Sequence, residues 1–190
     1  MNKKDIINNS FESHINLLGN MQKDFLEVID HASQEIVNLD YKKNKIFWCG
    51  NGGSASQANH LSAELVGGMY KKKIMPIQSI CLNCDSAFIT AWSNDDQFDN
   101  IFSRQLEALG RNEDILIALS TSGNSPNIIN AAKYAKSNGI YVISLTGNTG
   151  GEVKKYSDIN INVPSNDTQR VQEVHILIGH ILCDIAEKSL

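Results

Sequence analysis

Four hydroxyl side chains fall within one six-residue loop, Ser120-Thr121-Ser122-Gly123-Asn124-Ser125. An apolar run typical of a buried strand precedes this loop, and a helix with proline at its first position is expected to follow it. The start of a helix offers free backbone N–H groups and the positive end of the helix dipole. Together with the hydroxyl groups and Gly123, this predicts a site for a phosphate monoester that needs no lysine or arginine.

A second polar loop, Gly50-Asn51-Gly52-Gly53-Ser54-Ala55, also follows an expected strand and opens an expected helix. It matches the loose dinucleotide pattern G-x-G-x-x-A. The acidic residue that would end the second strand of a nicotinamide-binding unit is missing, because Asp85 comes too late. We therefore expect this glycine loop to hold sugar hydroxyl groups through Asn51, with Ser54 reaching either end of the ligand.

The helix expected after the glycine loop carries His60 and Glu64, four residues apart. This spacing places both side chains on one helix face, about one turn apart. An imidazole and a carboxylate together suit zinc.

The last expected helix carries Gln172 and, eight residues later, His180. Eight residues correspond to a rise of about 12 Å, so one metal ion binds both side chains only if each is near full reach. A second subunit that supplies one of them would give a simpler geometry. By itself, a histidine among apolar neighbours such as Ile178 and Ile181 is more often a core residue than a ligand.

These sites need elements that position them. Apolar residues at helical spacing predict two N-terminal helices over residues 5–38, broken near Gly19-Asn20. Short apolar runs then alternate with helical patterns, which predicts an α/β fold with a mainly parallel sheet and helices on both faces. The expected strands cover residues 45–49, 77–81, 114–119, 140–145 and 159–163, and the expected helices cover residues 55–69, 85–93, 98–109, 126–137 and 168–188, with an acidic loop at 93–96. Ligands of such folds bind beyond the carboxyl ends of the strands, so both polar loops are expected to border one crevice.

Composition narrows the class of protein. The chain has 190 residues and a formal net charge of −4, which is typical of one globular domain and argues against a broad nucleic-acid-binding surface. No apolar run is long enough to span a membrane, and no secretory signal is evident at the start, so a cytoplasmic location is expected. Cys81 and Cys84 form a C-x-x-C pair without a second pair, and we interpret them as a strand-end residue and a loop residue.

Taken together, the motifs resemble the bacterial phosphoheptose isomerases of the sugar-isomerase (SIS) domain superfamily. The resemblance covers essentially the whole chain. It rests on Cys49–Ser54, His60-x-x-x-Glu64, Asn94-Asp95, Ile101–Arg104, Ser120–Ser125, Leu145–Gly147 and Arg170–His175.

The resemblance implies a single SIS domain over residues 1–190, built as a three-layer sandwich. In it, residues 1–40 form an N-terminal helical pair for oligomer packing and residues 41–190 form the α/β core. It implies interconversion of D-sedoheptulose 7-phosphate and D-glycero-D-manno-heptose 7-phosphate, at the head of heptose biosynthesis for lipopolysaccharide or capsule. It also implies a homotetramer with sites at subunit contacts.

The resemblance further assigns site residues. The implied ligands of one zinc ion per subunit are His60, Glu64, Gln172 and His180. Aldose–ketose isomerisation needs a base at carbon and an acid at the carbonyl oxygen, and we expect Glu64 to be the general base and His180 the partner acid. The implied substrate-binding positions are Asn51, Gly52, Gly53, Glu64, Asn94, Asp95, Ser120, Thr121, Ser122, Ser125 and Gln172, to which the loop position adds Ser54. Some relatives carry an acidic residue where this chain has Gln169, so no acid–base role is assigned there.

Three alternatives remain at this stage. One is a non-catalytic SIS protein that binds the bacterial replication initiator, which the complete set of four metal ligands disfavours. A nicotinamide enzyme would purify with cofactor absorbance and without a metal. The third is a nucleotide-sugar or hexosamine isomerase of the same superfamily, and hexosamine-specific relatives usually carry different acid–base residues, of which the sequence shows no sign.

Overall fold

Five parallel strands form the centre of the molecule. The structure is a computed structural model that describes residues 2–70 and 75–190, except for the side chains of residues 22–24. The sheet order is β2-β1-β3-β4-β5, and every neighbouring pair of strands is parallel. The strands are β1 (Ile46–Gly50), β2 (Ser79–Cys81), β3 (Ile115–Ser120), β4 (Tyr141–Gly147) and β5 (Ile159–Val163).

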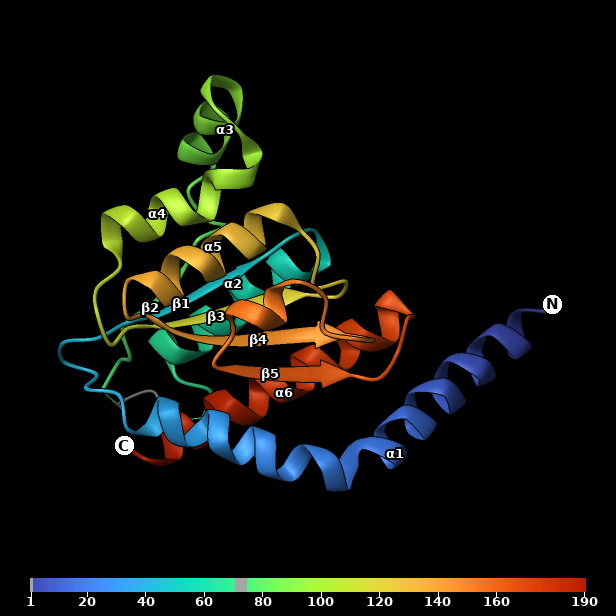
Figure 1. Ribbon diagram of the computed structural model, residues 1–190. Coiled ribbons are helices and arrows are strands. Elements are labelled where there is room, and N and C mark those ends of the chain that lie inside the picture. The colour runs from blue at the N-terminus through green and yellow to red at the C-terminus, as the bar shows by residue number, and fades with distance from the viewer. Residues whose placement is uncertain (1, 71–74) are drawn as a thin grey trace.

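Helices cover both faces of the sheet, which gives the expected three layers (Figure 1). The helices are α1 (Lys3–Val37), α2 (Gly53–Gly67), α3 (Ser86–Asp95), α4 (Ile101–Leu109), α5 (Pro126–Ser137) and α6 (Thr168–Lys188), with short 3₁₀ turns η1 (Phe98–Asn100) and η2 (Val153–Tyr156). Because both faces are covered, every residue of β1 and β3 is buried.

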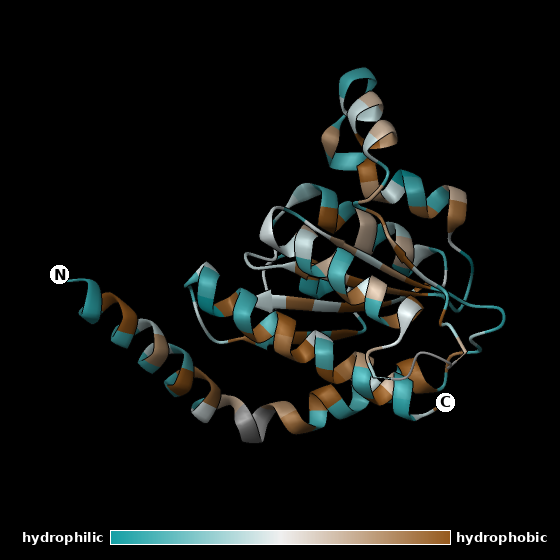
Figure 2. Cartoon of the chain, turned by 180° about the vertical axis from the view of Figure 1, so that it is seen from behind, coloured by the Kyte–Doolittle hydropathy of each residue, from teal (hydrophilic) through white to brown (hydrophobic). Residues whose placement is uncertain are grey.

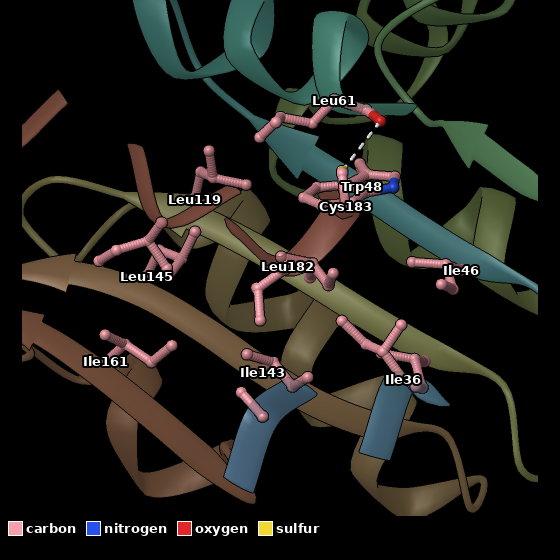
Figure 3. Packing of buried hydrophobic residues seen from close by; sticks show 14 of the residues in the cluster. Ile36, Ile46, Trp48, Leu61, Leu119, Ile143, Leu145, Ile161, Leu182 and Cys183 are labelled. Carbon is pink, nitrogen blue, oxygen red and sulfur yellow. Dashed lines mark hydrogen bonds between the residues drawn. The ribbon is translucent and has the colours of Figure 1, made fainter. Parts of the chain in front are cut away.

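Two hydrophobic clusters separate the layers. The larger one joins the sheet to α1, α2 and α6, and it includes Trp48, Leu61 and Leu182. Figure 3 shows its close packing, in which the Cys183 thiol also contacts the carbonyl oxygen of Leu61 at 3.7 Å. The second cluster joins the opposite face to α4 and α5. The two clusters thereby fix the positions of β1 and β3, from whose carboxyl ends the two polar loops begin.

The prediction of two N-terminal helices was wrong, because α1 is one helix of 35 residues. It begins with a capping box between Asn2 and Asp5 and runs through Gly19 and Asn20. A glycine inside a helix costs only about 1 kcal/mol and, unlike proline, removes no backbone hydrogen bond. Figure 1 shows that α1 bends near its middle and that its N-terminal half extends away from the sheet.

The predicted acidic loop at residues 93–96 was also wrong over most of its length, because Ser93, Asn94 and Asp95 form the last turn of α3. Asp85 begins this helix by accepting a hydrogen bond from the backbone N–H of Phe88 at 2.9 Å. The edge strand β2 begins two residues later than expected, at Ser79. The predicted range of α6 is confirmed in full.

Within the described residues, none of the helices is both long and apolar enough to cross a membrane.

Candidate active site

Two neighbouring helices, α2 and α6, run in the same direction and carry the candidate metal ligands. Near their starts, the Gln57 side chain donates to the carbonyl oxygen of Gln172 at 2.7 Å. Further along, Gly179 lies so close to Leu61 that a Cβ atom there would be 2.3 Å from Leu61 Cδ1. A side chain at this position would displace Leu61, so the glycine allows α6 to approach α2 closely. His180, the next residue, therefore lies beside the middle of α2.

Three of the predicted ligands come together in the structure. His60 Nε2 lies 2.9 Å from His180 Nε2 and 3.4 Å from Glu64 Oε1. The three ligand atoms lie within 4.8 Å of one another, and the two imidazole rings meet edge to face. Two ring nitrogens at 2.9 Å share one proton, which a divalent cation would replace with bonds to both lone pairs. This donor set fits zinc, and His180 is therefore not an isolated core histidine.

Gln172 lies apart from this triad. Its side-chain amide is 3.5 Å from Ser54 Oγ, and a Cβ atom at position 53 would lie 2.7 Å from its Nε2. The amide thus contacts the first residues of α2, about two turns before His60. Gln172 and His180 both contact the parallel helix α2, and they do so at different heights, Gln172 at Ser54 and His180 at His60.

The predicted phosphate loop connects β3 to α5. Gly123 has φ of 66°, and its N–H donates to the backbone oxygen and to Oγ of Ser120, each at 3.1 Å. Gly123 also packs against Gly150, where a Cβ atom would lie 2.1 Å from the carbonyl oxygen, so no other residue fits this turn. Ser125 occupies the N-cap position of α5, as predicted, but its side chain makes no capping hydrogen bond. Its hydroxyl group is available for a ligand.

A polar cavity of about 250 Å³ borders this loop at the carboxyl end of the sheet. Thr121, Ser122 and Asn124 form one wall, and Thr168 at the first position of α6 contributes to another. Asn148, also in the lining, has a φ of 50°, which is rare for a residue other than glycine. Larger hollows of about 490 and 730 Å³ lie near the amino ends of the strands and contain none of the predicted site residues.

The glycine loop is fastened on two sides by asparagine side chains. Asn83, in the turn after β2, accepts from the Gly50 N–H at 3.2 Å and donates to the Gly50 carbonyl oxygen at 2.8 Å. On the other side, Asn51 and Asn127 exchange two amide hydrogen bonds of 2.9 Å each. Neither Asn83 nor Asn127 stands in a sequence motif that indicates contact with this loop, so their roles are visible only in the folded chain.

Asn94 and Asp95 lie on α3, which projects from the body of the molecule in Figure 1. Both residues are exposed, and the Asn94 amide donates to Asp95 Oδ1 at 2.8 Å. Among the described residues, neither makes a hydrogen bond to the two polar loops or to the triad. No hydrogen bond within the described part of the protomer therefore joins these two predicted binding residues to the other site residues.

A further histidine, His175, contacts the strand next to the phosphate loop. His175 of α6 is fully buried, and its Nε2 lies 3.1 Å from the Thr146 carbonyl oxygen. Burial lowers the pKa of His175 to about 4, although the bond to Thr146 partly opposes this shift. The ring is therefore neutral near pH 7 and donates from Nε2. Thr146 pairs with Ser120 in the sheet, so His175 steadies the strand next to the phosphate loop.

Known proteins share both the sequence and the arrangement of these elements. The SIS domain family matches residues 11–147. The chain is 46% identical to the phosphoheptose isomerase of Sulfurimonas denitrificans over 187 residues, which cover 98% of this chain and 94% of that protein. It is 42% identical to the phosphoheptose isomerase of Helicobacter pylori, with 97% and 95% of the two chains covered. The chain belongs to the phosphoheptose isomerase family.

Solved structures of phosphoheptose isomerases agree along the whole chain. The enzyme from Francisella tularensis has a TM-score of 0.95 at 36% identity, covering 99% of this chain and 100% of that chain. The enzyme from Neisseria gonorrhoeae has a TM-score of 0.92 at 36% identity, covering 98% and 100%. These matches confirm the SIS fold and show that the chain is an isomerase. They do not favour the alternative of a non-catalytic protein that binds the replication initiator.

Proposed function

We propose that this isomerase interconverts D-sedoheptulose 7-phosphate and D-glycero-D-manno-heptose 7-phosphate in the cytoplasm, as the first step of heptose biosynthesis for lipopolysaccharide or capsule. The observation that carries the proposal is the pairing of a metal-type triad, His60, Glu64 and His180, with a hydroxyl-rich loop at the start of α5. In this proposal the loop binds the phosphate of the substrate, and the triad suits acid–base chemistry at the other end of the sugar. The identity of the proposed substrate comes from the relatives, which are named phosphoheptose isomerases.

In this proposal the substrate phosphate binds to Ser120, Thr121, Ser122 and Ser125. The backbone N–H groups at the start of α5 and the positive end of its dipole favour the dianion without a basic side chain. The sugar hydroxyl groups contact the glycine loop and Gln172. Asn94 and Asp95 complete the binding site as predicted, and in an oligomer α3 of a second subunit can supply them.

The reaction moves one proton between C1 and C2. Glu64 removes the proton from C1 of the ketose and returns it to C2, while His180 protonates the C2 carbonyl oxygen and accepts the proton of the C1 hydroxyl. The enediol between these steps has the same atoms as substrate and product, so no redox cofactor is required. Zinc held by His60, Glu64 and His180 would polarise the carbonyl group. Because a metal-bound carboxylate is a weaker base, Glu64 would have to release the metal while it carries the proton, and His180 would act through the ring nitrogen that the metal leaves free. Gln172 would become the fourth ligand only if its amide left Ser54. Gln169 is exposed at the start of α6 and receives no role.

We also propose that the enzyme is a homotetramer in which α1 makes subunit contacts. Figure 2 shows apolar residues along this helix, and Ile7, Phe11 and Ile15 are each more than half exposed. An apolar hollow of about 560 Å³ lies between α1 and α6. A second copy of the chain would cover both. Sedimentation of the zinc-loaded protein tests this proposal, and a metal-replete, active monomer would refute it.

A coupled assay on sedoheptulose 7-phosphate tests the function directly. We expect turnover by the zinc-loaded enzyme, a loss of more than about a hundredfold after chelation, and recovery when Zn²⁺ is added back. His60→Ala provides a matched control, because it should lower metal content without touching the phosphate loop. Absence of turnover in the zinc-loaded enzyme would overturn the proposed substrate. Full turnover after complete metal removal would overturn the metal assignment alone.

A further inference from the structure

A reciprocal pair of amides links the glycine loop to the first turn of α5, the helix that follows the phosphate loop. Asn51 Nδ2 donates to Asn127 Oδ1, and Asn127 Nδ2 donates to Asn51 Oδ1, both at 2.9 Å. The backbone N–H of Ile128 donates to the same Asn127 Oδ1 at 3.0 Å. Since that N–H can only donate, it fixes which end of the Asn127 amide is oxygen, and this in turn fixes the orientation of Asn51.

This pair is shielded from water on one side. Asn127 is 1% exposed, whereas Asn51 is partly buried at the end of β1. Hydrogen bonds in such a setting are stronger than in water, and a lost partner is costly. Asn127 is the second residue of α5, two positions after the proposed phosphate ligand Ser125. Asn51 is two positions before the start of α2, which carries the triad.

We infer that Asn127 is a positioning residue for the isomerisation, because its amide pair with Asn51 sets the span between the phosphate loop and the helix that carries Glu64. This inference rests on the proposed function. A sugar phosphate held at one end presents C1 and C2 to Glu64 only if that span matches its length. Asn51 retains one amide hydrogen and one lone pair with which to contact the sugar.

Other contacts besides this pair hold α5 and the glycine loop in the fold. Ile128 N–H also donates to the Ser125 carbonyl oxygen at 3.1 Å, so α5 keeps its first turn without the Asn127 side chain. Ile128, Ala131 and Ala132 anchor the helix in the second hydrophobic cluster. On the opposite side of the glycine loop, Asn83 continues to hold Gly50. Loss of the pair should therefore shift the loop and leave the domain folded.

The first test compares Asn127→Leu with Asn130→Leu in the zinc-loaded enzyme. Asn130 lies on the same helix and donates to the Asp99 carbonyl oxygen at 3.0 Å, so its replacement also removes an amide contact of α5 but leaves the loop pair intact. For Asn127→Leu we expect kcat to fall by about tenfold or more, with the inhibition constant of inorganic phosphate and the zinc content changed by less than about twofold. Asn130→Leu should retain kcat.

Two results of this comparison would overturn the inference. One is a normal kcat in Asn127→Leu. The other is a loss of activity that arises wholly from KM and matches a weaker inhibition by phosphate, because Asn127 would then shape only the phosphate loop. An inactive wild-type enzyme would instead count against the proposed substrate, so the two failures are distinguishable.

A double-mutant cycle gives the second test. If Asn127 acts through Asn51, then Asn51→Ala combined with Asn127→Leu should lose no more activity than the more damaging single variant. Additive losses would contradict the inference.

If Asn127→Leu does not fold, Asn127→Asp replaces it with nearly the same shape. The introduced carboxyl group can donate to Asn51 as the amide does only when it is protonated. The activity of this variant relative to wild type should therefore rise as pH falls. A ratio that is independent of pH would contradict the inference.

Discussion

The phosphate loop and the glycine loop occupy equivalent places in the fold and are built differently. Both connect the carboxyl end of a central strand to the start of a helix. In the glycine loop, Asn83 and Asn127 bind Gly50 and Asn51, so the loop's polar groups are largely used within the protein. In the phosphate loop, the Ser125 side chain leaves its helix uncapped.

Neither helix begins with a side-chain cap, because Gly52 has no side chain to offer and Ser125 makes no such bond. The loops differ in what holds them: amides from Asn83 and Asn127 hold the glycine loop, whereas the hydroxyl groups of Ser120 and Ser122 accept from the phosphate loop's own backbone. A hydroxyl group at an N-cap normally bonds to a backbone N–H two or three residues on. At Ser125 that bond is missing, so its hydroxyl group can face an anion. Of the first backbone groups of α5, Pro126 has no N–H and the Ile128 N–H already donates to Asn127 Oδ1, which leaves the N–H of Asn127 for the anion. In the glycine loop, two amide clamps instead align α2, and with it His60 and Glu64.

The largest effect is expected when Glu64, on the helix that follows the glycine loop, loses its basic group. Glu64→Gln keeps the shape of the side chain and removes its basicity, so we expect turnover to fall by well over about a hundredfold while substrate binding persists. Calorimetric titration with the sugar phosphate and the coupled assay measure the two quantities. Glu107→Gln, on the remote helix α4, serves as a control for the loss of an exposed carboxylate. A near-normal rate in Glu64→Gln would refute the assignment of the base.

A smaller effect is expected from the phosphate loop. Ser125→Ala removes one hydrogen bond to a charged phosphate, which should raise KM by about tenfold and leave kcat within about twofold. Because Ser125 makes no capping bond, the melting temperature should stay unchanged, unlike that of an ordinary N-cap variant. Ser137→Ala, at the other end of α5, is the matched control. A marked loss of stability without a change in KM would show that Ser125 is a cap and not a ligand.

Replacement of His175 should have the smallest effect on activity, but it should change how the stability of the fold depends on pH. Its pKa is about 4 in the fold, compared with 6.5 for a free histidine, so the unfolded chain takes up the proton first as pH falls. Stability from this group is therefore fully present above pH 6.5 and is lost as pH falls towards 4, by about 3 kcal/mol in all.

Urea unfolding at several pH values measures this loss. His175→Gln can still donate to the Thr146 carbonyl oxygen but does not titrate, so its stability should depend less on pH than that of the wild type between pH 4 and 6.5. Parallel pH profiles for the two proteins would contradict the prediction.

Much of this architecture could be predicted from local patterns in the sequence. The hydrophobic runs of β1 and β3 and the full range of α6 were predicted because side-chain periodicity and capping residues are short-range properties. The loop at Ser120–Ser125 and the pair His60 and Glu64 could be found for the same reason, since each motif lies within one turn or one helix.

The predicted helix break and the predicted acidic loop were wrong because, at both places, local sequence signals compete with each other or with packing. Gly19 and Asn20 resemble a helix break, yet α1 continues through them and its C-terminal half packs against the body of the domain. The acidic stretch at residues 93–95 resembles a loop, yet it completes α3. Helix propensity differences of about 1 kcal/mol or less cannot settle such cases.

The sequence alone thus indicated which residues are candidates to bind a phosphate and a metal ion. Only the tertiary structure decided which of them meet. His60 and His180 are 120 positions apart, and Asn51 and Asn127 are 76 positions apart. Such contacts depend on the parallel alignment of α2 with α6 and on the order of β1 and β3 in the sheet, which result from packing of the whole core. No periodicity within a single element encodes them.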